Sequence, residues 1–253
     1  MALKTKRYGW RPDLPDFRDH YLLPPLSAAE QTLPPATDLR MYCPPVYDQG
    51  QLGSCTANAI AGLLEFDQIK QGEPVFVPSR LQIYYDERDR EGTTNDDAGA
   101  YLRDGAWVAA NIGAAPEVLW PYSEGKFAKK PPPDVYAAAH KFQALQYARL
   151  KQDLDHLRGA LAGGIPFCFG FTVYESFESS EVASTGMVPM PKPGESVVGG
   201  HAVDAVGYDD SSARFICRNS WGDWGQAGYF TMPYEYLLSP DLSDDFWVLQ
   251  RVS

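Results

Sequence analysis

Cys55 stands where a cysteine can act as a nucleophile. Gly50, Gly53 and Ser54 lead into it, and the small and apolar residues that follow predict a helix beginning at Cys55. A thiol at a helix start faces unpaired backbone N–H groups and the positive end of the helix dipole, which stabilise the thiolate. The alternative is a buried structural cysteine, because an isolated cysteine is often packed in a core.

A cysteine nucleophile needs a base that accepts its proton, and that base needs a third group to orient it. The candidate bases are the four histidines, His20, His140, His156 and His201. The first lies in an irregular N-terminal stretch, and the next two lie in charged, helical segments where we expect solvated surface positions. His201 instead follows two glycines and opens an apolar strand, so the backbone leaves space on one side of it.

The next strand indicates how His201 is oriented. If residues 202–208 and 214–218 form a β-hairpin, Asn219 comes back beside His201 at the start of the first strand. The Asn219 amide oxygen can then accept the imidazole N–H and fix the ring tautomer. Trp221 could cover this hydrogen bond from water, so the spacing predicts a Cys–His–Asn arrangement.

The three segments around these residues resemble the active-site segments of papain-like cysteine peptidases. In that family the signature C-G-[SA]-C-[WY] is followed by a histidine and an asparagine roughly 130 to 150 residues downstream. His201 falls within that distance of Cys55, and Asn219 lies slightly beyond it. The resemblance covers residues 33–253, and the matching segments are residues 49–59, 199–203 and 219–229.

The resemblance implies a role for each matching residue. Cys55 would be the nucleophile, His201 its acid/base partner and Asn219 the orienting group. The Gln49 side-chain amide would form the oxyanion hole together with the backbone N–H of Cys55. The residues expected to hold a peptide substrate around these groups are Gly53, Ser54, Gly99, Ala100, Tyr101, Gly200, Ala202 and Trp221.

Some positions depart from the family pattern. Leu52 stands where the signature has its first cysteine, so we expect the family's usual disulfide beside the active site to be absent. Thr56 replaces the aromatic residue after the nucleophile, Ala100 replaces a glycine, and Gly200 replaces the Asp or Asn common before the histidine. These departures favour a bacterial type of the family with a short N-terminal segment.

The order of predicted elements indicates an α+β fold, and the resemblance implies that it is papain-like, with the active-site cleft between two subdomains. Residues 33–145 are predicted to be a mainly helical subdomain carrying Cys55, and residues 146–253 a mainly antiparallel β subdomain carrying His201 and Asn219. Residues 1–32 read as an N-terminal arm or short pro-segment. The predicted helices lie near residues 55–72, 79–88, 101–112 and 153–162, and the strands near 165–174, 202–208, 214–218, 228–232 and 246–252.

Composition excludes several classes of partner. The chain has 253 residues and a formal net charge of −11, so we expect neither nucleic acid nor an anionic membrane as a partner. We expect a monomer that needs no metal or cofactor. The chain shows no signal peptide, which makes the cytoplasm the default compartment and leaves secretion or delivery to a host open. At most one disulfide is expected among the three cysteines other than Cys55, namely Cys43, Cys168 and Cys217.

The function indicated by these residues is that of a cysteine endopeptidase. A thiolate/imidazolium pair would attack a peptide carbonyl and pass through an acyl-enzyme, with a polypeptide as substrate. The chain's own N-terminal segment is a second candidate occupant of the cleft. Two alternatives stay open, namely a thiol acyltransferase or deamidase that acts on Gln side chains, and a non-enzymatic binding protein on the same fold.

Overall fold

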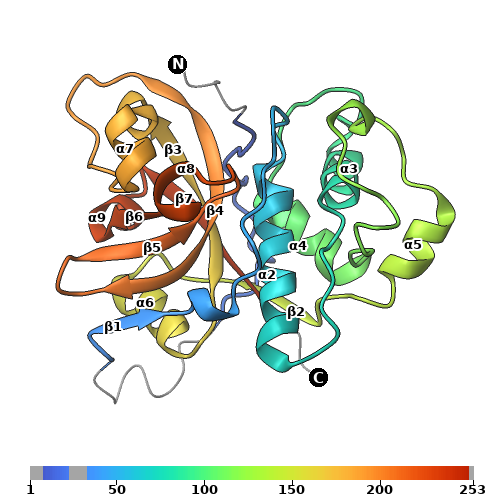
Figure 1. Cartoon of the computed structure of the whole chain (residues 1–253), viewed down its shortest axis with the longest axis horizontal. Coiled ribbons are helices and arrows are strands. Elements are labelled where there is room, and N and C mark those ends of the chain that lie inside the picture. The colour runs from blue at the N-terminus through green and yellow to red at the C-terminus, as the bar shows by residue number, and fades with distance from the viewer. Residues whose placement is uncertain (1–7, 23–32, 251–253) are drawn as a thin grey trace.

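The chain folds into two halves that pack side by side, one mostly helical and one built on an antiparallel sheet (Figure 1). The computed structural model describes residues 8–22 and 33–250. Helix α2 (Cys55–Gln71) lies at the junction of the two halves, against strand β4 (Val197–Asp209). The α+β organisation is therefore the one that the sequence predicts.

Helix α2 begins at Cys55, as predicted. Its residues are buried on nearly all sides, which explains why small and apolar side chains fill the segment after Cys55. The helix ends at Gly72, whose positive φ of 68° lets its N–H donate back to the last turn. The position of the thiol at a helix N-terminus is thus set by local sequence.

The other predicted helices are also present. Ser79 caps helix α3 (Arg80–Glu91) by accepting from the Gln82 backbone N–H at 3.3 Å. The other helical elements are η1 (Arg40–Tyr42), α4 (Leu102–Asn111), η2 (Glu124–Lys126), α5 (Pro133–Ala139), α6 (Leu154–Ala162), η3 (Glu175–Glu178), α7 (Ser180–Thr185), α8 (Trp224–Ala227) and α9 (Tyr234–Leu238).

The sheet runs in the order β2-β7-β3-β4-β5-β6, with β1 paired to β4 and every pairing antiparallel. Two of its strands, β1 and β2, are not predicted from the sequence, because three or four residues are too short to show a period. The strands besides β4 are β1 (Ala36–Asp38), β2 (Gln146–Arg149), β3 (Phe167–Tyr174), β5 (Arg214–Arg218), β6 (Tyr229–Pro233) and β7 (Ser243–Gln250).

Strand β4 is longer than predicted. It begins at Val197, so His201 lies inside the strand, opposite Phe171 of β3, and not at its start. The glycines at 199 and 200 disfavour a strand and led the prediction to start it too late. Glycine is needed at both positions for packing, because a Cβ at Gly199 would collide with Tyr8 and one at Gly200 with Trp10.

His156 is a second correction. It is buried, with its Nδ1 accepting from the backbone N–H of Lys151 at 3.0 Å, and so it is not a solvated surface residue. All four cysteines are free, so the one disulfide left open by the sequence is not formed. Within residues 8–22 and 33–250, none of the helices is both long enough and apolar enough to cross a membrane.

Two apolar clusters build the core. One fills the sheet half with aromatic side chains, and its Phe169 and Phe246 rings stack at 5.7 Å. The other joins α2 to the sheet and includes Cys55, Ala202 and Trp247. Because this second cluster spans both halves, the nucleophile segment packs against the strand that carries His201.

A buried ion pair also lies between the halves. Asp204 of β4 and Arg218 of β5 approach to 3.6 Å, and burial raises the pKa of Asp204 to about 8. Gly62 of α2 packs directly on this pair, since a Cβ there would lie 2.5 Å from Asp204 Oδ2 and 2.8 Å from Arg218 Nη1. A larger residue at 62 would have to push the pair or the helix aside.

We therefore expect Gly62→Ala to destabilise the protein, although alanine favours helix. Forcing a methyl group into a packed site costs about 1–3 kcal/mol. The midpoint of thermal unfolding should fall by roughly 2–4 °C per kcal/mol for a chain of this size. Gly125→Ala is the control, because nothing lies within 4 Å of a Cβ at that position. An equal midpoint in the two variants would contradict the prediction.

Candidate active site

The structure brings the predicted catalytic residues together at the junction of the two halves. Cys55 is the first residue of α2 and is fully buried. The backbone N–H groups of Thr56, Ala202 and Gly9 approach its thiol and favour the thiolate. The sulfur thus lies between the start of α2 and strand β4, beside Ala202, which follows His201 in the sequence.

His201 and Asn219 form the predicted hydrogen bond. Nε2 of His201 lies 2.8 Å from Oδ1 of Asn219, and the same oxygen accepts from the Ser220 backbone N–H at 2.8 Å. Because that oxygen is an acceptor, Nε2 must carry the proton of the neutral ring. Nδ1 has no hydrogen-bond partner in the described part of the chain, so its lone pair is available to accept a proton.

The hairpin register explains this approach. Asp204 of β4 pairs with Arg218 of β5, so the residues after Arg218 run back alongside His201. Trp221 stacks on the imidazole with ring centroids 4.6 Å apart and planes 30° apart. Trp221 is itself buried, and it therefore covers the His201–Asn219 hydrogen bond from water, as the sequence predicts.

Gln49 is buried and is held at both ends of its side chain. Its Oε1 accepts from the Ser220 hydroxyl at 2.6 Å, and its Nε2 donates to the Leu52 carbonyl at 2.9 Å. Its backbone N–H donates to the Ser220 carbonyl at 2.9 Å. Ser220, which the sequence analysis did not single out, therefore fixes both the backbone and the amide of Gln49.

The N-terminal arm covers these groups. Gly9 and Trp10 lie across the junction, where Trp10 forms an isolated bridge with Ala100. Ala100 N–H donates to the Gly9 carbonyl at 2.8 Å, and Trp10 N–H donates to the Gly200 carbonyl at 3.1 Å. The dark blue chain in Figure 1 runs between the two halves. Tyr8 places its ring 6.2 Å from His201, edge-on. The N-terminal segment was predicted as a candidate occupant of the cleft, and the structure describes its residues 8–22. Residues 1–7 and 23–32 lie outside the described part.

Gly9 leaves no room for a side chain, because a Cβ there would collide with the Gly53 carbonyl. Trp10 fills a pocket whose walls include Gly170 and Gly200, and its indole N–H donates to Asp245 at 3.1 Å. Neither Gly170 nor Asp245 is predicted from the sequence, since β3 and β7 carry no recognisable motif. The arm thus covers the thiol of Cys55, which is fully buried.

Charged groups hold the arm beyond Trp10. The side chain of Asp13, in the arm, accepts from the Trp247 indole at 3.0 Å, and the backbone N–H of Asp13 donates to Asp245 at 2.8 Å. Arg149 of β2 pairs with Asp245 and lies 3.5 Å from Asp13. Arg103 of α4 donates its backbone N–H to Asp13 at 3.3 Å, and its guanidinium pairs with Asp19 further along the arm at 2.8 Å. These contacts join the arm to both halves of the protein.

The predicted substrate-binding residues surround this segment of the arm. Tyr101 lies beneath Arg11, whose guanidinium is 4.3 Å from the ring centroid. Ser54 points elsewhere, to the Tyr122 hydroxyl at 2.6 Å. Among the predicted substrate-binding residues, those that contact Tyr8, Gly9 or Trp10 directly are Gly53, Gly99, Ala100, Gly200 and Trp221, while Ala202 contacts the Cys55 thiol. Their roles toward a substrate remain predictions.

Burial sets the charge state of the covered site. Desolvation raises the pKa of Cys55 to about 12 and lowers that of His201 to about 4. The pair is therefore neutral thiol and neutral imidazole while the arm is in place. This differs from the expected thiolate/imidazolium pair, and the cause is the loss of water around both groups.

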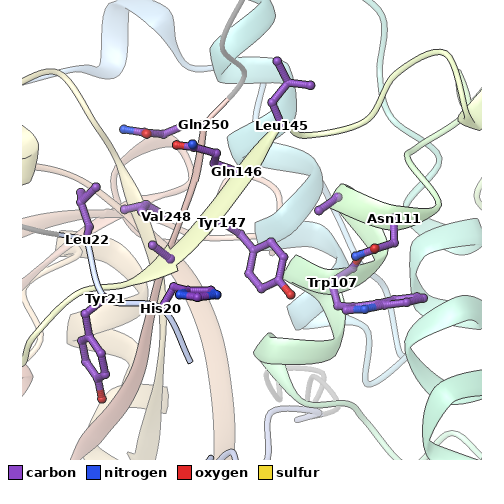
Figure 2. Close-up of a pocket in the computed structure, with 12 residues that line it drawn as sticks. His20, Tyr21, Leu22, Trp107, Asn111, Leu145, Gln146, Tyr147, Val248 and Gln250 are labelled. Carbon is purple, nitrogen blue, oxygen red and sulfur yellow. The ribbon is translucent and has the colours of Figure 1, made fainter. Parts of the chain in front are cut away.

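A wide hollow on the surface lies away from these residues. It has a volume of about 730 Å³ and is bordered by arm residues 20–22, helix α4 and strands β2 and β7, as Figure 2 shows. Trp107 and Tyr147 both line it. No predicted catalytic residue lines it. Among the described residues there is also no group of three or more His, Cys, Asp or Glu side chains that could hold a metal ion.

The neutral, covered thiol gives a direct prediction. Iodoacetamide should alkylate Cys55 slowly at pH 7, because the thiolate is the reactive form and a pKa of about 12 keeps it scarce. Gly9→Ala should displace the arm and raise the alkylation rate, roughly tenfold for each unit by which the pKa of the exposed thiol falls. Peptide mapping measures how fast Cys55 is alkylated relative to Cys43 in the same chain. Gly125→Ala is the matched control. An unchanged rate in Gly9→Ala would show that the arm does not protect the thiol.

Comparison with known proteins agrees with this site. The profile of the papain family cysteine proteases matches residues 33–236. An uncharacterized peptidase C1-like protein, L477, of Acanthamoeba polyphaga mimivirus is 45% identical over 216 residues, 81% of this chain and 70% of that protein. Cathepsin B-like CP3 of Giardia intestinalis is 29% identical over 236 residues, 84% of this chain and 73% of that protein.

Solved structures show the same fold. Xylellain, a cysteine protease from Xylella fastidiosa, superposes with a TM-score of 0.92 and 43% identity, and the match covers 100% of both chains. Digestive procathepsin L 3 of Tenebrio molitor superposes with a TM-score of 0.70 at 18% identity, covering 92% of this chain and 74% of that one. The papain-like fold predicted from the sequence is confirmed, and the chain belongs to the papain family of cysteine proteases.

Proposed function

We propose that this cysteine peptidase is an endopeptidase whose nucleophile is Cys55. The observation that supports this most directly is the His201 ring, held by Asn219 through Nε2 with Nδ1 left to accept a proton. A thiol at a helix N-terminus, an oriented imidazole and a side-chain amide are the groups that acyl transfer to a cysteine requires. The peptide substrate would replace Gly9 and Trp10 in the cleft.

The reaction starts when the arm leaves and water enters. The pKa of Cys55 then falls and that of His201 rises, so the thiol proton moves to Nδ1. The sulfur forms a bond to the peptide carbonyl carbon, and the carbonyl oxygen becomes an oxyanion that accepts from Gln49 Nε2 and the Cys55 N–H. His201 protonates the leaving nitrogen as the C–N bond breaks. It then removes a proton from water, which displaces the sulfur from the acyl-enzyme.

The arm acts as an inhibitor of this reaction in our proposal. Ala100 offers its backbone N–H and carbonyl to the arm, with Arg11 N–H donating to that carbonyl at 3.3 Å. An extended substrate would need the same two groups. Since the arm and substrate compete for one edge, the covered state is inactive and displacement of residues 8–11 activates it.

Cys55→Ala in the full-length Gly9→Ala chain should abolish hydrolysis of an internally quenched peptide library, because no other group supplies the nucleophile. Cys43→Ala in the same background should retain the activity, since Cys43 lies outside the site. Peptide cleavage is measured by fluorescence, and mass spectrometry locates the cleaved bonds. Hydrolysis by the Cys55→Ala chain would refute the assignment. Product formation only with an added amine would identify an acyltransferase instead.

The stability of the docked arm should also depend on pH. Burial and the neighbouring Asp13 raise the pKa of Asp245 to about 8, and burial raises that of Asp13. A released arm solvates Asp13 and lowers its pKa, so the docked state binds more protons than the released one. Through this pair, arm docking weakens as the pH rises toward about 8. His201 acts in the opposite direction below its ordinary pKa of about 6.5, because burial lowers its pKa in the docked state, so the effect of the pair is expected above about pH 6.5.

Hydrogen exchange of residues 8–22, corrected for its intrinsic pH dependence, measures this effect in the inert Cys55→Ala chain. Protection should decrease between about pH 6.5 and pH 8, the window above the ordinary pKa of His201. Asp13→Asn keeps an acceptor for the Trp247 indole but cannot titrate, so the pH dependence should flatten in that variant. Protection that increases with pH would contradict the assignment of protons to this pair.

A further inference from the structure

The loop before the nucleophile, residues 49–54, has no covalent support. Leu52 stands where a cysteine is expected, and all four cysteines of the chain are free. Gly50 and Gly53 also give this loop more conformational freedom than most residues would. Yet an oxyanion hole works only if its donors are fixed before the reaction begins. Some other contact must hold the loop.

Ser220 holds Gln49 at one end of the loop, and Glu124 accepts from the Gln51 N–H at 3.0 Å. Asp97 makes the contact at Gly53, from the polar loop after α3. Its Oδ1 accepts from the Gly53 backbone N–H at 3.0 Å and from the Tyr84 hydroxyl. The same hydroxyl accepts from the Gly99 N–H at 3.2 Å. One carboxylate and one phenol therefore connect the nucleophile loop to residue 99, beside the edge that Ala100 offers to an extended chain.

The Gly53 N–H belongs to the same peptide group as the Leu52 carbonyl. That carbonyl accepts from Nε2 of Gln49 at 2.9 Å. Asp97 and Gln49 thus hold opposite ends of one peptide unit, and rotation of that unit would break both hydrogen bonds. A carboxylate on the N–H side also polarises the peptide, which strengthens the bond that its carbonyl accepts.

Asp97 is itself held in place. Arg88 is fully buried, and its guanidinium lies 4.0 Å from the centroid of the Tyr84 ring. It donates to the backbone carbonyls of Thr94 at 2.9 Å and Asp96 at 3.1 Å, and so fixes the loop on the side before Asp97. The loop looks irregular in sequence, but its backbone is tied to α3.

We propose that Asp97 is a positioning residue that orients the Gln49 amide for the oxyanion through the Leu52–Gly53 peptide. It does non-covalently what a disulfide beside the nucleophile would otherwise do. This inference rests on the proposed function, because it assigns Gln49 to the oxyanion hole. Asp97 should therefore affect the stability of the transition state, and should change neither the affinity for substrate nor the reactivity of the thiol.

The test uses the full-length Gly9→Ala chain, in which the arm is displaced, with Asp97→Asn and Asp97→Ala added. Loss of an oxyanion-hole donor typically costs a factor of about 100 to 1,000 in kcat. A donor that is misoriented and not lost should cost less, so we expect kcat to fall roughly tenfold in Asp97→Ala, with KM nearly unchanged. Asp97→Asn keeps an acceptor oxygen and should lie between the two.

Two further measurements separate positioning from general damage. A peptide aldehyde forms a hemithioacetal whose oxygen occupies the oxyanion hole, so its Kd should rise in parallel with the fall in kcat. Alkylation of Cys55 by iodoacetamide needs no oxyanion hole and should keep its rate. Aldehyde binding is measured as protection of Cys55 from alkylation, and it therefore reports on Gln49 even in a chain that does not hydrolyse peptides.

Asp96→Asn is the matched control, because Asp96 is the exposed neighbour in the same loop. It should leave kcat, aldehyde Kd and alkylation unchanged. If Asp97→Ala unfolds, Tyr84→Phe removes the second donor to Asp97 and should shift aldehyde Kd in the same direction by a smaller factor. Unchanged aldehyde Kd in the Asp97 variants would overturn the inference, as would an equal loss of alkylation rate. Failure of the Gly9→Ala parent to hydrolyse any peptide would count against the proposed function alone.

Discussion

The site depends on a short antiparallel contact that joins the two halves. Asp48 forms a bridge with Trp221, and Gln49 and Ser220 exchange a backbone and a side-chain hydrogen bond across it. Cys55 comes from the helical half, whereas His201 and Asn219 come from the sheet half. Their distances are therefore set by this contact and by the packing of α2 on β4, and not by either half alone.

Desolvation then decides which state the site adopts. With the arm in place, Cys55 and His201 are both fully buried, and burial opposes charge on each of them. The helix N-terminus and three backbone N–H groups favour the thiolate, but they do not overcome the absence of water. The arm thus acts on the electrostatics of the pair as well as on access to it.

Local sequence predicted the parts of the site that local physics fixes. Cys55 at a helix start and Asn219 beside His201 follow from caps, glycines and a hairpin, and the structure confirms their placement. The prediction that His201 lies at the start of a strand was wrong, because β4 begins four residues earlier. The two glycines before His201 do not mark the start of the strand; they are small because the arm packs against them. Asp97 and Asp245 were not predicted, since each acts through one tertiary contact that leaves no period or motif.

Thr56 shows how a departure from the family pattern is accommodated. Its hydroxyl donates to Glu87 at 2.8 Å, and Glu87 is fully buried beneath the start of α2. Burial raises the pKa of Glu87 well above its ordinary value, because loss of water favours the neutral carboxyl over the carboxylate. An ionised Glu87 would oppose the thiolate at Cys55, whereas a neutral one leaves the helix dipole free to favour it. A small hydroxyl residue at 56 is therefore compatible with the chemistry, because it donates to a carboxyl group whose burial disfavours a negative charge beside Cys55.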